Sequence, residues 1–329
     1  MSAWSDESLV GWTPNAGDVV VATAGKSGTT WMQQIITQLL AGGSEDALDD
    51  FGSLHELSPW VSFRVSSPAV LAARSPEFAR AWLATRKGVD ELDLFKLLGD
   101  GEAEAAALDR QSALIRALRP RVPDGRVVLK THEPFSEGLG CPCVFVARDG
   151  LDGVLSLYNH WRATKPAYRA AAAAAAGLPE APLDSASRFL DLWLDDFRGY
   201  GAPREGVATW AATVESYWDA RGRVRLVHFS DLKRDARAEA ARVAAHCAIA
   251  ADDAVLDAAV AHSAFAYMKR RERWFELDTL EPGAFLRGGA DGGGRAAFSD
   301  AQVARYEAAA EAALGAECAR WLRGGGGVS

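Results

Sequence analysis

Residues 19–40, VVVATAGKSGTTWMQQIITQLL, join an apolar β-branched run to a small polar turn and an amphipathic stretch. The run at 18–23 is typical of a buried strand in a parallel sheet. The apolar face that follows predicts a helix from about Thr29. Backbone amides in a tight turn before a helix N-terminus bind anions, and Lys26 adds a full positive charge. This feature restricts the chain to folds in which a parallel sheet presents an anion-binding loop.

The rest of the chain alternates short apolar runs with helical patterns. Strands are expected at 126–130, 143–147 and 223–229, and helices at 102–119, 151–162, 232–245 and 252–263. This alternation predicts an α/β fold with a P-loop-like, doubly wound parallel sheet flanked by helices. Ligands bind such sheets at the carboxyl ends of the strands, where each motif described below begins.

Length and composition narrow the class of protein. The chain has 329 residues, of which 49% are hydrophobic, and we expect a single domain over 1–329. An alanine-rich mobile excursion is expected at 165–182, and a flexible glycine-rich tail at 324–329. No run of 18 apolar residues is present, so we expect no membrane partner. The net charge of −8 argues against a nucleic-acid partner.

The N-terminal sequence and the cysteines indicate the compartment. The first twelve residues lack the basic region and apolar core of a secretory signal. The four cysteines have neither the spacing of a zinc site nor a good pairing for a disulfide. We therefore expect reduced thiols, no metal and a cytoplasmic protein.

The polar turn departs from the loop of nucleotide hydrolases. The pattern G-x-x-x-x-G-K-[ST] requires glycine at position 20, where this chain has Val20. The lysine instead begins the turn, in the order Lys26-Ser27-Gly28-Thr29-Thr30-Trp31. This hexapeptide resembles the 5′-phosphosulfate loop of the sulfotransferases that use 3′-phosphoadenosine-5′-phosphosulfate (PAPS).

The second expected strand leads into Lys130-Thr131-His132. The same family has a Lys-Thr-His stretch here, and its histidine is the catalytic base. An acceptor hydroxyl is a poor nucleophile until a base removes its proton, and the pKa of histidine suits that task. Lys130, two residues earlier, can oppose charge that develops on the transferring group.

Arg148 directly follows the third expected strand, and Ser156 comes eight residues later. In the family an arginine and a serine at this spacing bind the 3′-phosphate of the cofactor, and a guanidinium suits a bidentate phosphate contact. The aromatic stretch at 158–161 also resembles the family, and we interpret it mainly as core.

Two later segments resemble the part of the family that holds adenine and the 3′-phosphate. Phe229 stands where the family has a tyrosine near the adenine, and Phe265 where an aromatic ring packs on it. Arg287, Gly288 and Gly289 correspond to the family's Arg-Lys-Gly clamp on the 3′-phosphate.

This last segment also departs from the family. Gly288 replaces a lysine, and Gly293 and Gly294 replace an Asp-Trp pair, so we expect a looser segment with one charged contact fewer. The family's dimer motif is not matched at Ser299-Asp300 and Arg305, which leaves the question of a homo-oligomer open.

The resemblance implies an enzyme that moves a sulfuryl group from PAPS to a hydroxyl or amine of a small, apolar acceptor, releasing adenosine 3′,5′-bisphosphate (PAP). Lys26, Lys130 and His132 are the expected catalytic groups, and no metal is required. Trp60, Phe63 and Phe135 are candidates for the acceptor pocket. A P-loop kinase or nucleotide hydrolase and a non-catalytic nucleotide-binding protein are the alternatives. Val20 argues against the first, and the presence of both Lys26 and His132 argues against the second.

Overall fold

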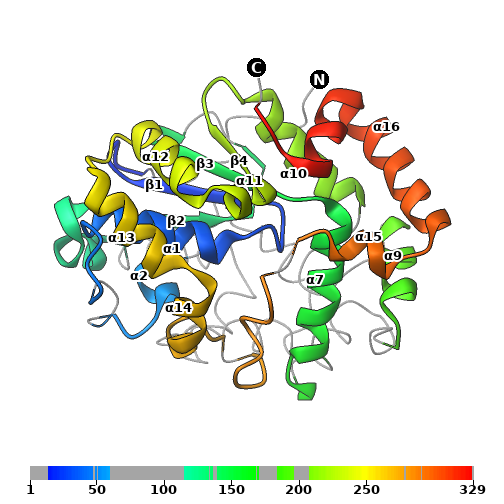
Figure 1. Ribbon diagram of the computed structural model, residues 1–329, viewed down its shortest axis with the longest axis horizontal. Helices are drawn as coiled ribbons and strands as arrows, with labels where there is room; N and C mark the ends of the chain where they lie inside the picture. Colours follow the sequence, from blue (N-terminus) through cyan, green and yellow to red (C-terminus); the bar gives the residue numbers. More distant parts are fainter. Residues whose placement is uncertain are drawn as a thin grey trace, which may run out of the picture.

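A parallel sheet lies at the centre of the computed structural model (Figure 1). The structure describes residues 14–46, 49, 51–59, 115–132, 134–135, 139–167, 169, 184–195, 207–277, 279–289 and 291–327. In these ranges the strands are β1 (Val19–Thr23), β2 (Val128–Thr131), β3 (Cys143–Ala147) and β4 (Arg225–His228). They are arranged in the order β2-β1-β3-β4, and every pairing is parallel.

This order places a switch point between β1 and β3. The chain passes from β1 outward to β2, and then returns to the opposite side of β1 to form β3. Crossovers on the two sides leave a crevice at the carboxyl ends of these strands, where ligands bind in sheets of this kind. The α/β fold with a parallel sheet flanked by helices is thus confirmed.

Helices connect and cover the strands. They are α1 (Thr29–Leu40), α2 (Leu54–Leu57), α7 (Gly150–Ala163), α9 (Ala186–Leu194), α10 (Val207–Asp219), α11 (Phe229–Arg234), α12 (Ala236–His246), α13 (Asp253–Ser263), α14 (Phe265–Arg270), α15 (Gly293–Ala297) and α16 (Asp300–Gly324). Short 3₁₀ turns are η2 (Arg119–Arg121), η3 (Pro123–Gly125) and η5 (Glu272–Trp274). Side-chain caps begin several helices; Asp149, for example, accepts from the Leu151 amide at 2.9 Å at the start of α7.

The core has two halves because successive strand residues point to opposite faces of the sheet. Val19 and Val21 face one half, which is covered by α1, α12 and α13. Val20 and Ala22 face the other half, formed mainly with α7, α9, α10 and α16. Figure 1 shows these two groups of helices on either side of the strands. Burial on both faces explains why the strands are continuous apolar runs.

Parts of the expected domain organisation lie outside the described residues. In the alanine-rich stretch these are residues 168 and 170–182. The tail is described as far as residue 327, where the Gly326 amide donates to Asp231 at 2.9 Å. The Trp321 indole donates to the Gly326 carbonyl at 3.2 Å. The single domain, the mobility of the excursion and the flexibility of the tail stay predictions.

Candidate functional site

The turn at residues 24–28, which we call the lysine loop, joins β1 to α1 through left-handed backbone conformations. Lys26 has φ 64° and Gly28 has φ 105°. A Cβ atom added at Gly28 would lie 2.8 Å from Phe229 Cδ2, so position 28 requires glycine. Lys26 has a side chain that makes this conformation unfavourable, and the left-handed backbone there costs about 1–2 kcal/mol. Strain of this kind is typical of functional loops.

The N-terminus of α1 is arranged to hold an anion. Its N-cap, Gly28, offers no side-chain cap, and the first turn contains no acidic residue. The first intrahelical bond runs from the Met32 amide to Gly28 O, so the three amides before Met32 have no partner within the helix. The hydroxyls of Ser27 and Thr29 are on buried side chains beside these amides. Amides, hydroxyls and the helix dipole together favour a phosphate-like group.

Positive charges converge on the lysine loop. Burial and, to a smaller extent, the charges of Arg148 and Arg287 together lower the pKa of Lys26 to about 8. These three cations come from the ends of β1 and β3 and from the segment after α14. Repulsion among them is relieved when an anion binds between them. The residues present therefore fit a multiply charged anion such as a nucleotide phosphate.

His132 lies at the carboxyl end of β2, next to β1. Its Nδ1 is 2.9 Å from the Thr23 carbonyl oxygen and 3.0 Å from Thr23 Oγ1. A carbonyl only accepts, so Nδ1 carries the proton and Nε2 carries the lone pair. Thr23 Oγ1 is in turn 2.7 Å from Thr29 Oγ1 in the first turn of α1. A short chain of polar groups therefore joins the histidine to the anion-binding helix end.

The surroundings keep His132 neutral. Burial lowers its pKa to about 3, and the nearby charges of Lys130 and Lys26 act in the same direction, whereas the bond to Thr23 opposes them. A neutral imidazole with its lone pair on Nε2 can take a proton from an acceptor group. The two lysines and the histidine expected from the sequence are therefore brought together by β1 and β2.

Two further histidines belong to the same cluster. His55 was given no role from the sequence, and His160 lies in the stretch at 158–161 that we interpreted mainly as core. His160 Nδ1 is 3.2 Å from Lys26 Nζ, and His55 Nε2 is 3.0 Å from the Phe275 carbonyl oxygen. Burial and the charge of Lys130 lower the pKa of His55 to about 4. Burial, Lys26 and Lys130 hold the pKa of His160 well below its usual range. The sequence did contain one indication that His160 belongs to the site: it lies four residues after Ser156 on the same helix, so the two side chains share a face.

The position of α7 explains the contact between His160 and Lys26. A Cβ atom at Gly153 would lie 3.8 Å from the Gly25 carbonyl oxygen, so the helix passes beside the lysine loop. Ser156 lies three residues after Gly153, and His160 lies four residues after Ser156, which places all three on one helical face. The predicted phosphate serine and His160 are therefore successive turns of the same face.

The glycine-rich segment, described at residues 287–289 and 291–295, is attached to the start of α7. The amides of Gly292 and Gly294 donate to the Asp152 carboxylate at 2.7 and 2.6 Å. A Cβ atom at Gly294 would lie 2.4 Å from the Leu151 carbonyl carbon, so only glycine allows this approach. Arg148 lies next to it, 3.4 Å from Asp152 and 3.9 Å from Asp291. Backbone bonds to Asp152 thus anchor the segment that we expected to be looser.

The two aromatic residues expected near adenine occupy different environments. Phe229 is only 6% exposed, with the Arg148 guanidinium 4.3 Å from its ring centre and the Trp31 ring 5.6 Å away. Phe265 is 37% exposed, and its ring faces Gly289, where an added Cβ would lie 3.1 Å from it. Phe229 therefore packs against Gly28 and Arg148, whereas the partly exposed ring of Phe265 lies beside the glycine-rich segment, where a ligand could contact it.

The acceptor candidates are only partly described. Trp60 and Phe63 lie outside the described residues. Phe135 packs on Tyr217 of α10 at 5.7 Å between ring centres, with the Arg223 guanidinium 5.1 Å from its ring. Its role in an acceptor pocket stays a prediction.

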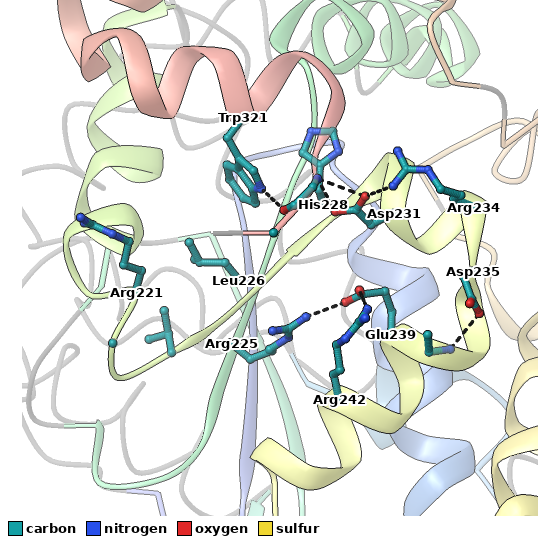
Figure 2. A pocket seen from close by; sticks show the side chains of 15 residues that line it. Arg221, Arg225, Leu226, His228, Asp231, Arg234, Asp235, Glu239, Arg242 and Trp321 are labelled. Atoms are coloured by element: carbon teal, nitrogen blue, oxygen red, sulfur yellow. Dashed lines mark hydrogen bonds and ion pairs between the residues drawn. The ribbon is translucent and has the colours of Figure 1, made fainter. Parts of the chain in front are cut away.

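A separate pocket of about 490 Å³ lies along β4, between α11, α12 and the end of α16 (Figure 2). Its arginines face carboxylates: Arg225 is 2.9 Å from Glu239, and Arg234 is 2.5 Å from Asp231. None of the site residues predicted from the sequence lines this pocket. We therefore place the candidate site at the lysine loop.

Two features of the described residues bear on membrane and metal partners. No helix in these ranges is long and apolar enough to cross a bilayer. No group of three or more His, Cys, Asp or Glu side chains in the same ranges is arranged to hold a metal ion.

Comparisons with known proteins indicate one family. A family model described as the sulfotransferase domain matches residues 16–317. Sulfotransferase 1C2 of Oryctolagus cuniculus is 23% identical over 227 residues, which cover 63% of this chain and 68% of that protein.

Solved structures of low sequence identity share the fold. Retinol dehydratase in complex with androsterone and the inactive cofactor PAP has a TM-score of 0.59 at 17% identity, covering 94% of this chain and 84% of that one. The mouse sulfotransferase SULT7A1 complexed with PAP has a TM-score of 0.58 at 16% identity, covering 96% and 93%.

Proposed function

The chain belongs to the sulfotransferase domain family, and on that premise we propose that it transfers a sulfuryl group from PAPS to a hydroxyl or amine of a small, apolar acceptor, with His132 as the general base. The observation that carries this proposal is the bond from His132 Nδ1 to the Thr23 carbonyl at 2.9 Å. It holds the imidazole in the tautomer whose Nε2 accepts a proton, at the strand end beside Lys26.

The residues that would hold the cofactor follow from the anion-binding geometry. The first-turn amides of α1 and the hydroxyls of Ser27 and Thr29 suit the 5′-phosphosulfate, together with Lys26. Arg148, Ser156 and Arg287, with the backbone of Gly288 and Gly289, are proposed for the 3′-phosphate, and Phe265 for the adenine. PAP in the solved relatives supports a cofactor of this class.

When bound, PAPS supplies the sulfuryl group, whose bond to the 5′-phosphate oxygen breaks as its bond to the acceptor oxygen or nitrogen forms. His132 Nε2 takes the proton that the acceptor loses. Lys26 and the helix amides neutralise charge on the departing phosphate, and Lys130 faces the transferring group. The anionic cofactor also offsets the two lysine charges that lower the pKa of His132, so the imidazole becomes a stronger base in the complex.

Replacement of the base tests the proposal. We expect His132→Ala to bind PAP with unchanged affinity, measured by calorimetry, but to lose about 10²–10⁴-fold in labelled-sulfate transfer to a panel of phenols, alcohols and amines. His246→Ala is the matched control, because His246 binds the Cys143 carbonyl at the opposite end of β3. Normal turnover by His132→Ala would contradict the role of the base, and absence of PAP binding and of transfer by the unmodified protein would contradict the function itself.

A further inference from the structure

His132 and His160 are held in opposite tautomers beside the same lysine. Lys26 Nζ only donates, so the His160 Nδ1 that faces it at 3.2 Å must be an acceptor. His160 is neutral at pH 7, because its pKa lies well below the usual range, and its proton is therefore on Nε2. His132 has the reverse arrangement, with the proton on Nδ1 and the lone pair on Nε2. One imidazole thus offers an acceptor and the other a donor.

Both rings belong to one polar cluster. The charges of Lys26 and Lys130 each act on His132 and on His160. Both histidines are half-buried, so each retains an accessible edge. The cluster therefore combines a base and a hydrogen-bond donor whose pKa values are both lowered by the same two ammonium groups.

An aromatic ring, that of Phe285, lies beside this cluster. Phe285 lies with its ring centre 5.9 Å from Lys26 Nζ and 5.8 Å from the His55 ring. The segment that carries it is fastened to the end of α7, where the Lys165 amide donates to Thr279 at 2.9 Å and the Glu281 amide donates to Ala163 at 2.8 Å. This attachment keeps the Phe285 segment alongside the part of α7 that carries His160.

We propose that the acceptor is a 1,2-dioxygenated aromatic ring, whose reacting hydroxyl is deprotonated by His132 and whose neighbouring oxygen accepts a hydrogen bond from His160 Nε2. His160 is then a specificity-determining residue. This inference rests on the proposed function and adds the substrate class. Because His160 donates, the second oxygen needs only a lone pair, so a methoxy group serves as well as a hydroxyl. A methyl group in the same place has the size but not the lone pair.

The hydrogen bond donated by His160 Nε2 also sets how strongly the site should prefer a neighbouring oxygen over a methyl group. A site that provides a hydrogen bond rejects an analogue that cannot accept it, because the donor is left without a partner. One neutral hydrogen bond corresponds to about 3–10-fold in affinity. We expect 2-methoxyphenol to bind the PAP-loaded protein about 10-fold more tightly than 2-methylphenol.

Calorimetry on the full chain saturated with PAP measures this without turnover. The His160→Phe protein should bind the two phenols within twofold of each other, and His160→Asn, whose amide both donates and accepts, should restore the preference. PAP affinity and melting temperature are measured for each variant, because His160 also contacts Lys26. A preference that survives in the folded His160→Phe protein, equal binding by the unmodified protein, or binding of neither phenol would each overturn the inference. The transfer assay on His132→Ala reports on the proposed function separately.

Discussion

The affinity of the site for PAP should fall steeply as pH rises above 8, because Lys26 loses its proton in the empty site. Burial and two neighbouring guanidinium groups lower its pKa from 10.5 to about 8. That shift corresponds to about 3 kcal/mol of disfavoured charge. A bound bisphosphate removes much of this cost and raises the pKa again. Binding above pH 8 therefore takes up a proton, which weakens it as protons become scarce.

The size of the effect follows from linkage. Between the pKa of free Lys26 and that of the complex, the dissociation constant should rise about tenfold per pH unit. From pH 8 to pH 10 the loss is about 40-fold if the lysine regains its full pKa of 10.5 in the complex. Phosphates are fully ionised here, since their second pKa is about 6. Burial lowers the pKa of His55 to about 4 and that of His132 to about 3, and it holds the pKa of His160 well below its usual range, so these histidines stay neutral throughout.

Calorimetry from pH 7 to pH 10 in buffers of different ionisation enthalpy measures both the affinity and the proton uptake. We expect uptake of about one proton per PAP at pH 9. Lys26→Arg is the informative variant, because a guanidinium keeps its charge throughout this range, so its affinity should not fall with pH. A flat profile for the unmodified protein, or the same slope in Lys26→Arg, would refute the assignment of the proton to Lys26.

Three further changes have defined outcomes. Thr23→Val should lower transfer about tenfold with little change in PAP affinity, because it removes the hydroxyl 3.0 Å from His132 Nδ1; Thr23→Ser should recover the activity, and steady-state kinetics measure both. Gly288→Lys should tighten PAP binding about 3–10-fold in low salt, because it adds a positive charge at a position with open space around it and a φ that is not left-handed. Gly288→Gln, which adds no charge, should leave the affinity for PAP unchanged. Gly294→Ala should reduce the free energy of unfolding by about 2–3 kcal/mol in urea titrations, because its Cβ would lie 2.4 Å from the Leu151 carbonyl carbon, whereas Gly293→Ala, with 3.9 Å of room, should be neutral.

Much of the fold was predictable because local patterns suffice for it. The apolar run at 143–147 has the bounds of β3, and the helix expected at 151–162 is within one residue of α7 at each end. These segments are buried on both faces or capped by their own residues, so composition identifies them. The helix expected from about Leu232 divides instead into α11 and α12, because Asp235 begins the second helix by capping the Ala238 amide.

Part of the candidate site was predictable for a similar reason. His132 and Arg148 each follow a strand directly and Lys26 lies three residues after one, and the carboxyl ends of parallel strands meet at one edge. Motifs at strand ends therefore identify neighbours without any knowledge of packing. Phe229 was harder to place, since whether it faces a ligand or supports Gly28 depends on how α11 begins.

By itself, the sequence determined the α/β fold and the family, and it located the lysine loop, because these depend on short segments whose chemistry is local. The tertiary structure alone decided that His160 reaches Lys26, that the Thr23 carbonyl selects the tautomer of His132, and that Gly294 lies against α7. These contacts join residues 134, 109 and 142 or more positions apart. Such distances are closed by packing of helices on the sheet, and no pattern in one segment encodes the hydrogen-bond partner that another will supply.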